Sequence, residues 1–123
     1  GTRFALTDES SASDIFKEYC LRLNEGDTKL LLKKLAPTRL VTNSFRDRVE
    51  AAEGRGASAE ELRELLGRGR AKKGIFEGDL EEGELDIGQV AALFRRRQSV
   101  DEVMKELLEG YRRASDKIRS AGL

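Results

Sequence analysis

The sequence predicts an α+β chain that is mostly helical and contains one β-hairpin. Of its 123 residues, 38% are hydrophobic and 37% are charged, and the apolar residues recur at helical spacing along several segments. So regular a pattern indicates a folded, helix-rich chain rather than a disordered one. The only proline separates two short segments that favour strands, and this places the hairpin.

The chain opens with a short, partly apolar segment, residues 1–6, which we expect to be a strand end or the loop just after one. A helix is expected from 14 to 24, because apolar side chains in it repeat every three or four residues. Gly26 is expected to end this helix. The predicted buried stripe of the helix consists of Ile15, Phe16, Tyr19, Cys20 and Leu23.

Residues 28–35 and 39–45 are the two strand candidates of the hairpin. Pro37 occupies the turn, where its fixed φ helps and no backbone donor is lost. Arg39 and Asn43 lie on the second strand and could be functional. The preferred interpretation is that Arg39 is a surface side chain and that Asn43 bonds nearby backbone.

Three further helices are expected, over residues 46–53, 58–66 and 99–119. The last two begin with Ser-x-x-Glu capping boxes, in which serine and glutamate satisfy each other's free backbone N–H groups. The apolar stripe of the final helix is expected to pack into a core, in preference to a membrane surface or a coiled-coil seam. That stripe consists of Val100, Val103, Met104, Leu107, Leu108, Tyr111, Ala114 and Ile118.

The segment from 74 to 94 joins glycine-spaced acidic residues to an apolar run. The change from loop to helix chemistry places residues 86–89 at a helix N-terminus, where backbone N–H groups are unpaired, and we expect a site there. The acidic residues do not follow the twelve-residue ligand pattern of a calcium loop. Glu84 and Asp86 could act as paired carboxylates, although a solvated loop is the preferred interpretation.

Composition argues against several classes of function. With 23 basic and 23 acidic side chains, the chain has no net charge, which weakens a role in binding nucleic acid or an anionic membrane. No apolar run approaches the roughly 18 residues that span a bilayer. The absence of histidine removes the commonest general base and metal ligand, so we predict neither a catalytic residue nor a metal site. A single cysteine, Cys20, excludes an internal disulfide and favours a reducing, cytoplasmic compartment.

The N-terminal segment resembles a known family. GTRFALTDES, residues 1–10, followed by Phe-Lys-Glu at 16–18, resembles the GTRF-x-x-T-x-E-S…(Y/F)K-E segment of the nitronate monooxygenases. These enzymes, formerly called 2-nitropropane dioxygenases, are related to the FMN-dependent enoyl-acyl-carrier-protein reductases. In that family the segment closes a flavin-binding (β/α)₈ TIM barrel, and its Gly-Thr backbone helps to hold the FMN phosphate. The resemblance implies this cofactor-binding role for Gly1 and Thr2, in agreement with the phosphate sites that barrels form after strands 7 and 8.

A second segment, residues 77–94, resembles the G-D-x-x-x-G…G-Q-x-x-G-L element of the same family, which lies near the flavin and the substrate pocket. The resemblance implies a substrate-side role for Asp86, Gly88 and Gln89. Asp86 stands where many members have a small residue, and Ala92 replaces the second glycine of the family pattern, so the substrate is left open. An alternative for Gln89, held with equal weight, is that its amide only braces the turn.

The resemblance implies that this chain is the C-terminal portion of an FMN-dependent oxidoreductase of nitronates, nitroalkanes or related small substrates. A barrel needs roughly 250 residues, so the chain alone is expected to be inactive. We divide it into the end of the last barrel strand with the following helix (1–26), a hairpin and helical substrate-side subdomain (27–86), and closing helices (87–123). The implied partners are the remainder of the barrel N-terminal to Gly1, a small-molecule substrate and a second copy in a homo-oligomer.

Two alternative functions stay open. One is an FMN-dependent enoyl-acyl-carrier-protein reductase, because that group is related to the nitronate monooxygenases. The other is a non-enzymatic helical interaction module, in which exposed apolar stripes would bind a partner protein.

Overall fold

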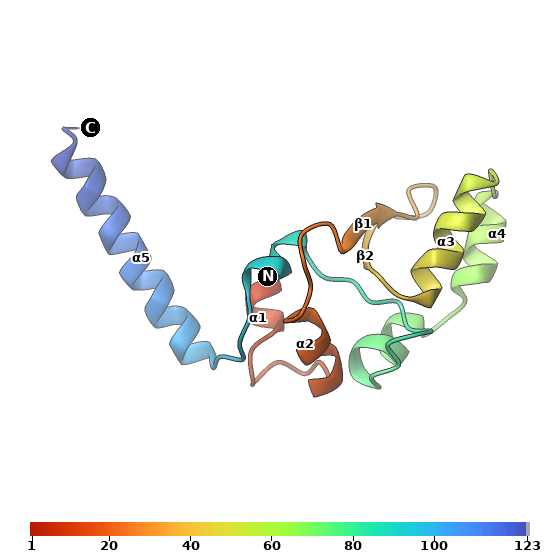
Figure 1. Ribbon diagram of the computed structural model, residues 1–123, viewed down its shortest axis with the longest axis horizontal. Helices are drawn as coiled ribbons and strands as arrows, with labels where there is room; N and C mark the ends of the chain where they lie inside the picture. Colours follow the sequence, from red (N-terminus) through yellow and green to blue (C-terminus); the bar gives the residue numbers. More distant parts are fainter. Residues whose placement is uncertain (123) are drawn as a thin grey trace.

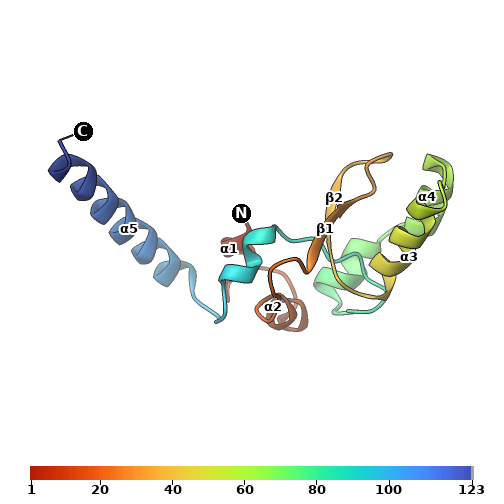
Figure 2. The same ribbon diagram turned by 45° about the horizontal axis from the view of Figure 1, so that its top comes forward.

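The computed structural model describes residues 1–122 and shows an extended arrangement of helices around one two-stranded antiparallel sheet. Helix α5 (Val100–Ser120) projects from one end, and α3 (Ser44–Gly54) with α4 (Ala59–Leu66) forms the other (Figures 1 and 2). The hairpin and the N-terminal helices lie between them. The prediction of a mostly helical chain with one hairpin is confirmed for the described residues.

The chain begins with a helical turn, α1 (Thr2–Ala5), so the strand end expected over residues 1–6 is wrong. The turn closes its own backbone, because Ala5 N–H donates to the Gly1 carbonyl at 3.0 Å, and it needs no neighbouring strand. Helix α2 (Asp14–Cys20) follows, capped by the Ser13 side chain, and is shorter than expected. Gly26 does not end it but lies in the following turn with φ +88°.

A buried lysine holds the loop between these two helices. Lys17 is only 2% exposed, and its ammonium group donates to the carbonyls of Asp8 at 3.2 Å and Ser10 at 2.8 Å. Carbonyl partners of this kind offset the cost of removing a charged group from water. The loop after α1 is therefore fastened to α2.

The hairpin consists of β1 (Thr28–Leu31) and β2 (Thr38–Val41), with Thr28 opposite Val41. Both strands are shorter than predicted. The first ends where Leu32 adopts a left-handed conformation with φ 57°. The second ends because Asn43 caps α3, which places residues 44 and 45 in that helix.

Strand β2 joins two separate cores. Successive strand residues point to opposite faces, so Leu40 packs with α3 and α4, whereas Val41 packs with α2 and residues 85–91. On its free edge, β2 also contacts the later chain: Leu40 forms an antiparallel bridge with Asp86, and Val41 N–H donates to Leu85 O at 2.7 Å. The hairpin therefore fixes where residues 84–88 lie.

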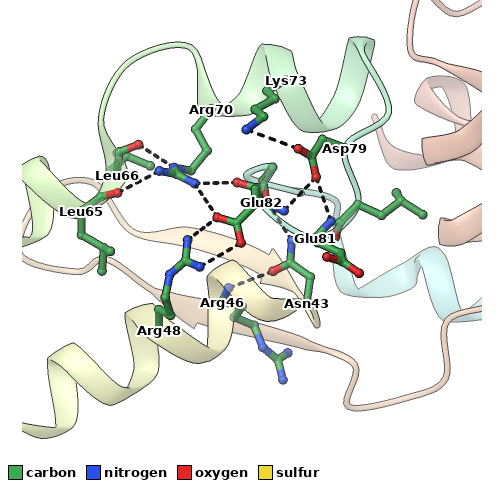
Figure 3. A network of polar contacts seen from close by, with 12 residues as sticks. Asn43, Arg46, Arg48, Leu65, Leu66, Arg70, Lys73, Asp79, Glu81 and Glu82 are labelled. Carbon is green, nitrogen blue, oxygen red and sulfur yellow. Dashed lines mark hydrogen bonds and ion pairs between the residues drawn. The ribbon is translucent and has the colours of Figure 1, made fainter.

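The acidic loop, residues 77–84, is clamped from two sides (Figure 3). Asn43 accepts a hydrogen bond from Arg46 N–H while its amide donates to the carbonyls of Leu80 at 3.1 Å and Gly83 at 2.8 Å. Arg70 donates to the carbonyl of Glu82 at 2.6 Å and stacks over the Phe45 ring at 4.3 Å. The expectation that Asn43 bonds nearby backbone is confirmed.

Acidic side chains of this loop are themselves engaged. Glu82 forms a two-pronged ion pair with Arg48, and Asp79 Oδ1 accepts from the N–H groups of Glu81 and Glu82 at 3.1 and 2.9 Å. These bonds lower the pKa values of both carboxyls. The loop is thus an ordered turn, in which Asp79 bonds the loop backbone and Glu82 binds Arg48 of α3.

Gly83 of this loop packs directly against the backbone of Gly74. Gly74 lies within a turn of π-helix, η1 (Lys72–Phe76), and a Cβ added to it would lie 2.9 Å from Gly83 Cα. A Cβ on Gly83 would lie 2.7 Å from Gly74 N and still closer to the Asp79 carbonyl. Side-chain atoms do not approach backbone so closely, so only glycine allows this crossing.

Helix α5 does not fulfil its predicted role. Its complete capping box, Ser99 with Glu102, confirms the predicted start. Yet Val103, at 1% exposure, is the only residue of α5 that is buried, so the expectation that the stripe packs into a core is wrong for the described chain. The stripe is exposed because α5 extends beyond every other described element (Figure 1). Its exposed members are Met104, Leu107, Leu108, Tyr111 and Ile118.

No helix among residues 1–122 has the length and apolar character needed to cross a membrane.

The glycine crossing gives a first prediction. Gly83→Ala should lower the free energy of unfolding by about 3 kcal/mol or more, because its methyl group meets backbone that cannot rotate away. Gly110→Ala is the matched control. It lies in α5, where a Cβ meets only the flexible end of Arg113 at 3.9 Å. Urea denaturation of both variants measures the difference, and equal stability of the two would refute the packing constraint.

Candidate functional site

The two segments with expected site residues meet in space. Gly88 N–H donates to Thr2 Oγ1 at 3.0 Å, although 86 positions separate these residues in the sequence. Gly88 precedes a 3₁₀ turn, η2 (Gln89–Leu93), which begins where a helix was predicted but is short. A Cβ on Gly88 would clash with the Thr2 hydroxyl, so the contact requires glycine at this position.

A cleft of about 520 Å³ opens beside this contact. Three parts of the chain form it: α1, the start of β2, and the extended segment before η2. Arg39 and Asp86 are the charged side chains that line it. Its full lining is Thr2, Ala5, Pro37, Thr38, Arg39, Asp86, Ile87 and Gly88.

Glu84 and Asp86 are half-buried, so the expectation of a solvated loop is wrong for these two residues. Burial raises the pKa of Asp86 above its ordinary value. Burial also raises the pKa of Glu84, and the nearby negative charge of Asp86 adds to that shift. Within residues 1–122, the buried Oδ1 of Asp86 has no hydrogen-bond partner. An unpartnered buried carboxyl oxygen is costly and is a mark of a site that can receive a ligand.

Gln89 lies apart from this cleft. It is exposed and lines a different hollow with Glu25, Val90, Leu93 and other residues. In the described part of the chain its amide makes no hydrogen bond, so the structure provides no bracing contact for it. Of the three expected substrate-side residues, Asp86 and Gly88 are therefore together and Gln89 is separate.

Gly1 is the N-cap of the first helical turn, α1, and Thr2 is the first residue of that turn. Gly1 is exposed, and a Cβ added to it would meet no heavy atom within 4 Å. Thr2 is half-buried and lines the cleft.

Arg39 is a cleft residue that the sequence raised as a functional candidate but did not favour. It was expected at the surface, but it is half-buried and lines the same cleft as Thr2 and Asp86. Its placement follows from the bridge between Leu40 and Asp86, which places the segment around Asp86 beside the free edge of β2. That pairing is a long-range contact, and no local pattern around Arg39 signals it.

No group of three or more His, Cys, Asp or Glu side chains within residues 1–122 is arranged to hold a metal ion. The buried thiol of Cys20 has its pKa raised to about 12 by burial, which keeps it protonated and unreactive. The chemistry of the cleft therefore depends on hydroxyl, guanidinium and carboxyl groups.

Comparison with known proteins adds the family context. The model of a family described as nitronate monooxygenase matches residues 1–110. The structure of FabK from Thermotoga maritima covers 98% of this chain with 27% identity and a TM-score of 0.85, and a mutant FabK from the same organism covers 98% with 25% identity and a TM-score of 0.79. This chain spans 38% and 35% of the lengths of those two chains. No curated protein matches it.

The half-buried carboxyls make stability depend on pH. Since the pKa of Asp86 is raised on folding, the folded chain holds that proton at a pH where the unfolded chain has lost it. Stability should therefore fall as pH rises through the interval between the unfolded and folded pKa values. Asp86→Asn removes this charge and should raise the free energy of unfolding at about pH 7, on the order of 1 kcal/mol or less because a half-exposed carboxyl is only partly desolvated.

Thermal unfolding of Asp86→Asn and the unsubstituted chain at about pH 7 and at about pH 3, below the ordinary pKa of aspartate, measures the effect. The advantage of the variant should disappear at the lower pH. Glu64→Gln, at an exposed position on α4, is the control and should be neutral at both. An equal gain at both pH values would contradict an origin in the buried charge.

Proposed function

The chain belongs to the nitronate monooxygenase family, and we propose that it forms the C-terminal portion of an FMN-dependent oxidoreductase of nitronates, nitroalkanes or related small substrates. The observation that carries the proposal is the contact between Thr2 and Gly88. It brings the segment expected to bind the cofactor and the segment expected to face the substrate to one cleft. Such convergence is what a site for a redox reaction between flavin and substrate requires.

Gly1 and Thr2 would hold the FMN phosphate. The fit is supported by the half-buried position of Thr2 at the cleft. Thr2 Oγ1 accepts from Gly88 N–H, which leaves its hydroxyl hydrogen free to donate to a ligand. When bound, the flavin supplies the electron transfer, and the chain's own residues position ligands around it.

Asp86 and Gly88 would form the substrate side, and the family resemblance adds Gln89. Gly88 allows close approach of the backbone, and Asp86 places a carboxyl at the pocket edge. No histidine is present in the chain, so an acid or base would come from elsewhere in the parent protein. We therefore propose that the 123 residues alone are inactive.

The proposed partner is the remainder of a barrel N-terminal to Gly1. The share of the FabK chains that this chain spans, 38% and 35%, supports such a remainder. The proposed organisation keeps the three regions 1–26, 27–86 and 87–123, a cytoplasmic location, and self-association as a further option for the exposed apolar surface of α5.

A FabK-type activity is the second candidate, because two solved structures that resemble the chain are FabK structures. A FabK-type activity corresponds to the FMN-dependent enoyl-acyl-carrier-protein reductase named as an alternative from the family resemblance. A helical interaction module without a flavin is the remaining alternative, and the exposed stripe of α5 supports it.

The deciding experiment is the intact mass and visible absorbance of this polypeptide purified from its native source. A longer polypeptide with bound flavin, and turnover of a nitronate in preference to an enoyl thioester, is the expected result. The reverse substrate preference would assign the FabK-type activity. A polypeptide that neither carries flavin nor takes up added FMN would contradict both enzyme proposals.

The phosphate assignment is tested by Thr2→Glu in that flavoprotein. Placing a carboxylate against a phosphate should abolish FMN retention, because the two negative charges repel each other at short distance. Thr2→Ser keeps the hydroxyl that accepts from Gly88 and should retain FMN. Flavin content after gel filtration measures both, and full retention by Thr2→Glu would refute the role of Thr2.

A further inference from the structure

Arg39 is the one cation among the described residues that line the cleft. Its Nη1 donates to Thr28 Oγ1 at 3.3 Å, and no ion pair among residues 1–122 involves it. By contrast, the arginines at 48, 70 and 97 each contact a carboxylate. An arginine fork left half-buried without an anionic partner is available to a ligand.

The rest of the cleft complements this fork. Within residues 1–122, Thr2 Oγ1 accepts a hydrogen bond from Gly88 N–H and donates none, so its hydroxyl hydrogen is free. Thr38, in contrast, already donates its hydroxyl to the Ala36 carbonyl at 2.8 Å. Among the side chains of the lining residues, donors therefore remain on the guanidinium of Arg39 and the hydroxyl of Thr2. The proposed function assigns the Thr2 hydroxyl to the FMN phosphate, so Arg39 is the donor left for a second anion.

We propose that Arg39 is a specificity-determining residue that binds a planar, two-oxygen monoanion, the class to which carboxylates and nitronates belong. A guanidinium donates two parallel N–H groups to the two oxygens of such a group, which gives both affinity and orientation. The identity of this anion as a nitronate substrate rests on the proposed function. The anion site itself rests on the cleft.

The single charge of the proposed ligand matches the single positive charge of Arg39, the one cation among the described residues that line the cleft.

The direct test is a titration of the 123-residue chain with sodium acetate, followed by the nitrogen NMR signal of the Arg39 side chain. A saturable shift is expected. Arg39→Gln should weaken acetate binding about tenfold or more, the loss expected for a charge-assisted hydrogen bond. Arg39→Lys keeps the charge but not the fork and should bind with intermediate affinity.

Two controls separate binding from structure. Thr28→Val removes the bond that orients Arg39 but keeps the guanidinium, and should retain saturable acetate binding. Arg68→Gln removes an exposed arginine outside the cleft and should change nothing. Acetate binding that survives Arg39→Gln, or that Arg68→Gln reduces equally, would overturn the proposal.

A second titration, with inorganic phosphate, tests the class of the ligand. Inorganic phosphate should bind more weakly than acetate. Tighter binding of phosphate would overturn the monoanion assignment and make this a phosphate site.

In the native flavoprotein, Arg39→Gln should raise KM for propyl-2-nitronate about tenfold, and kcat should change much less, because binding is lost uniformly. An unchanged KM would refute the role in specificity. Absence of flavin from that protein would contradict the proposed function alone, since the acetate titration needs neither flavin nor turnover.

Discussion

The crossing of Gly74 over Gly83 is the contact on which the position of the candidate site depends. Neither residue tolerates a Cβ, since each would meet the backbone of the other. Three residues beyond Gly83 the chain is already paired with β2, through the bridge of Leu40 with Asp86, and two residues later Gly88 contacts Thr2. A displacement of the crossing by the width of a methyl group would move all of these contacts, because no flexible segment separates them.

The clamp formed by Asn43 and Arg70 explains how this crossing is held. Asn43 caps α3 with its oxygen and holds the acidic loop with its nitrogen, so the start of a helix and the end of a loop share one amide group. Arg70 adds bonds to the carbonyls of Leu65, Leu66 and Glu82. The core of α3 and α4 is thus rigidly connected to the segment that reaches the cleft, although it contributes no side chain to that cleft.

Local features of the fold could be predicted from the sequence, and contacts between distant segments could not. Capping at Ser99 depends on residues within a few positions and is found, as is the hairpin itself. The turn of the hairpin lies at residues 33–35, earlier than predicted, and Pro37 directly precedes β2. The strand end at residues 1–6 failed because Thr2 and Phe4 favour strands only when a neighbouring strand is present, and here the backbone closes on itself. Helix α5 has a regular apolar stripe, but periodicity does not say what covers the stripe. Family resemblance selected Thr2 and Gly88, whereas Arg39 was left open by the sequence and reaches the cleft through a bridge between distant segments.

The orientation of Asp86 follows from its apolar neighbours. In the sequence Glu84-Leu85-Asp86-Ile87 the side chains alternate as in a strand: Leu85 is 1% and Ile87 9% exposed, and both belong to the core beneath the hairpin. Burying those two side chains stabilises the chain by about 1.5–3 kcal/mol each, whereas desolvating a carboxyl opposes folding. The apolar gain decides the register, and the carboxyls at 84 and 86 must then point to the other side. The Val41–Leu85 bond fixes that register, so Asp86 reaches the cleft as a consequence of core packing and leaves the unpartnered oxygen that a ligand can use.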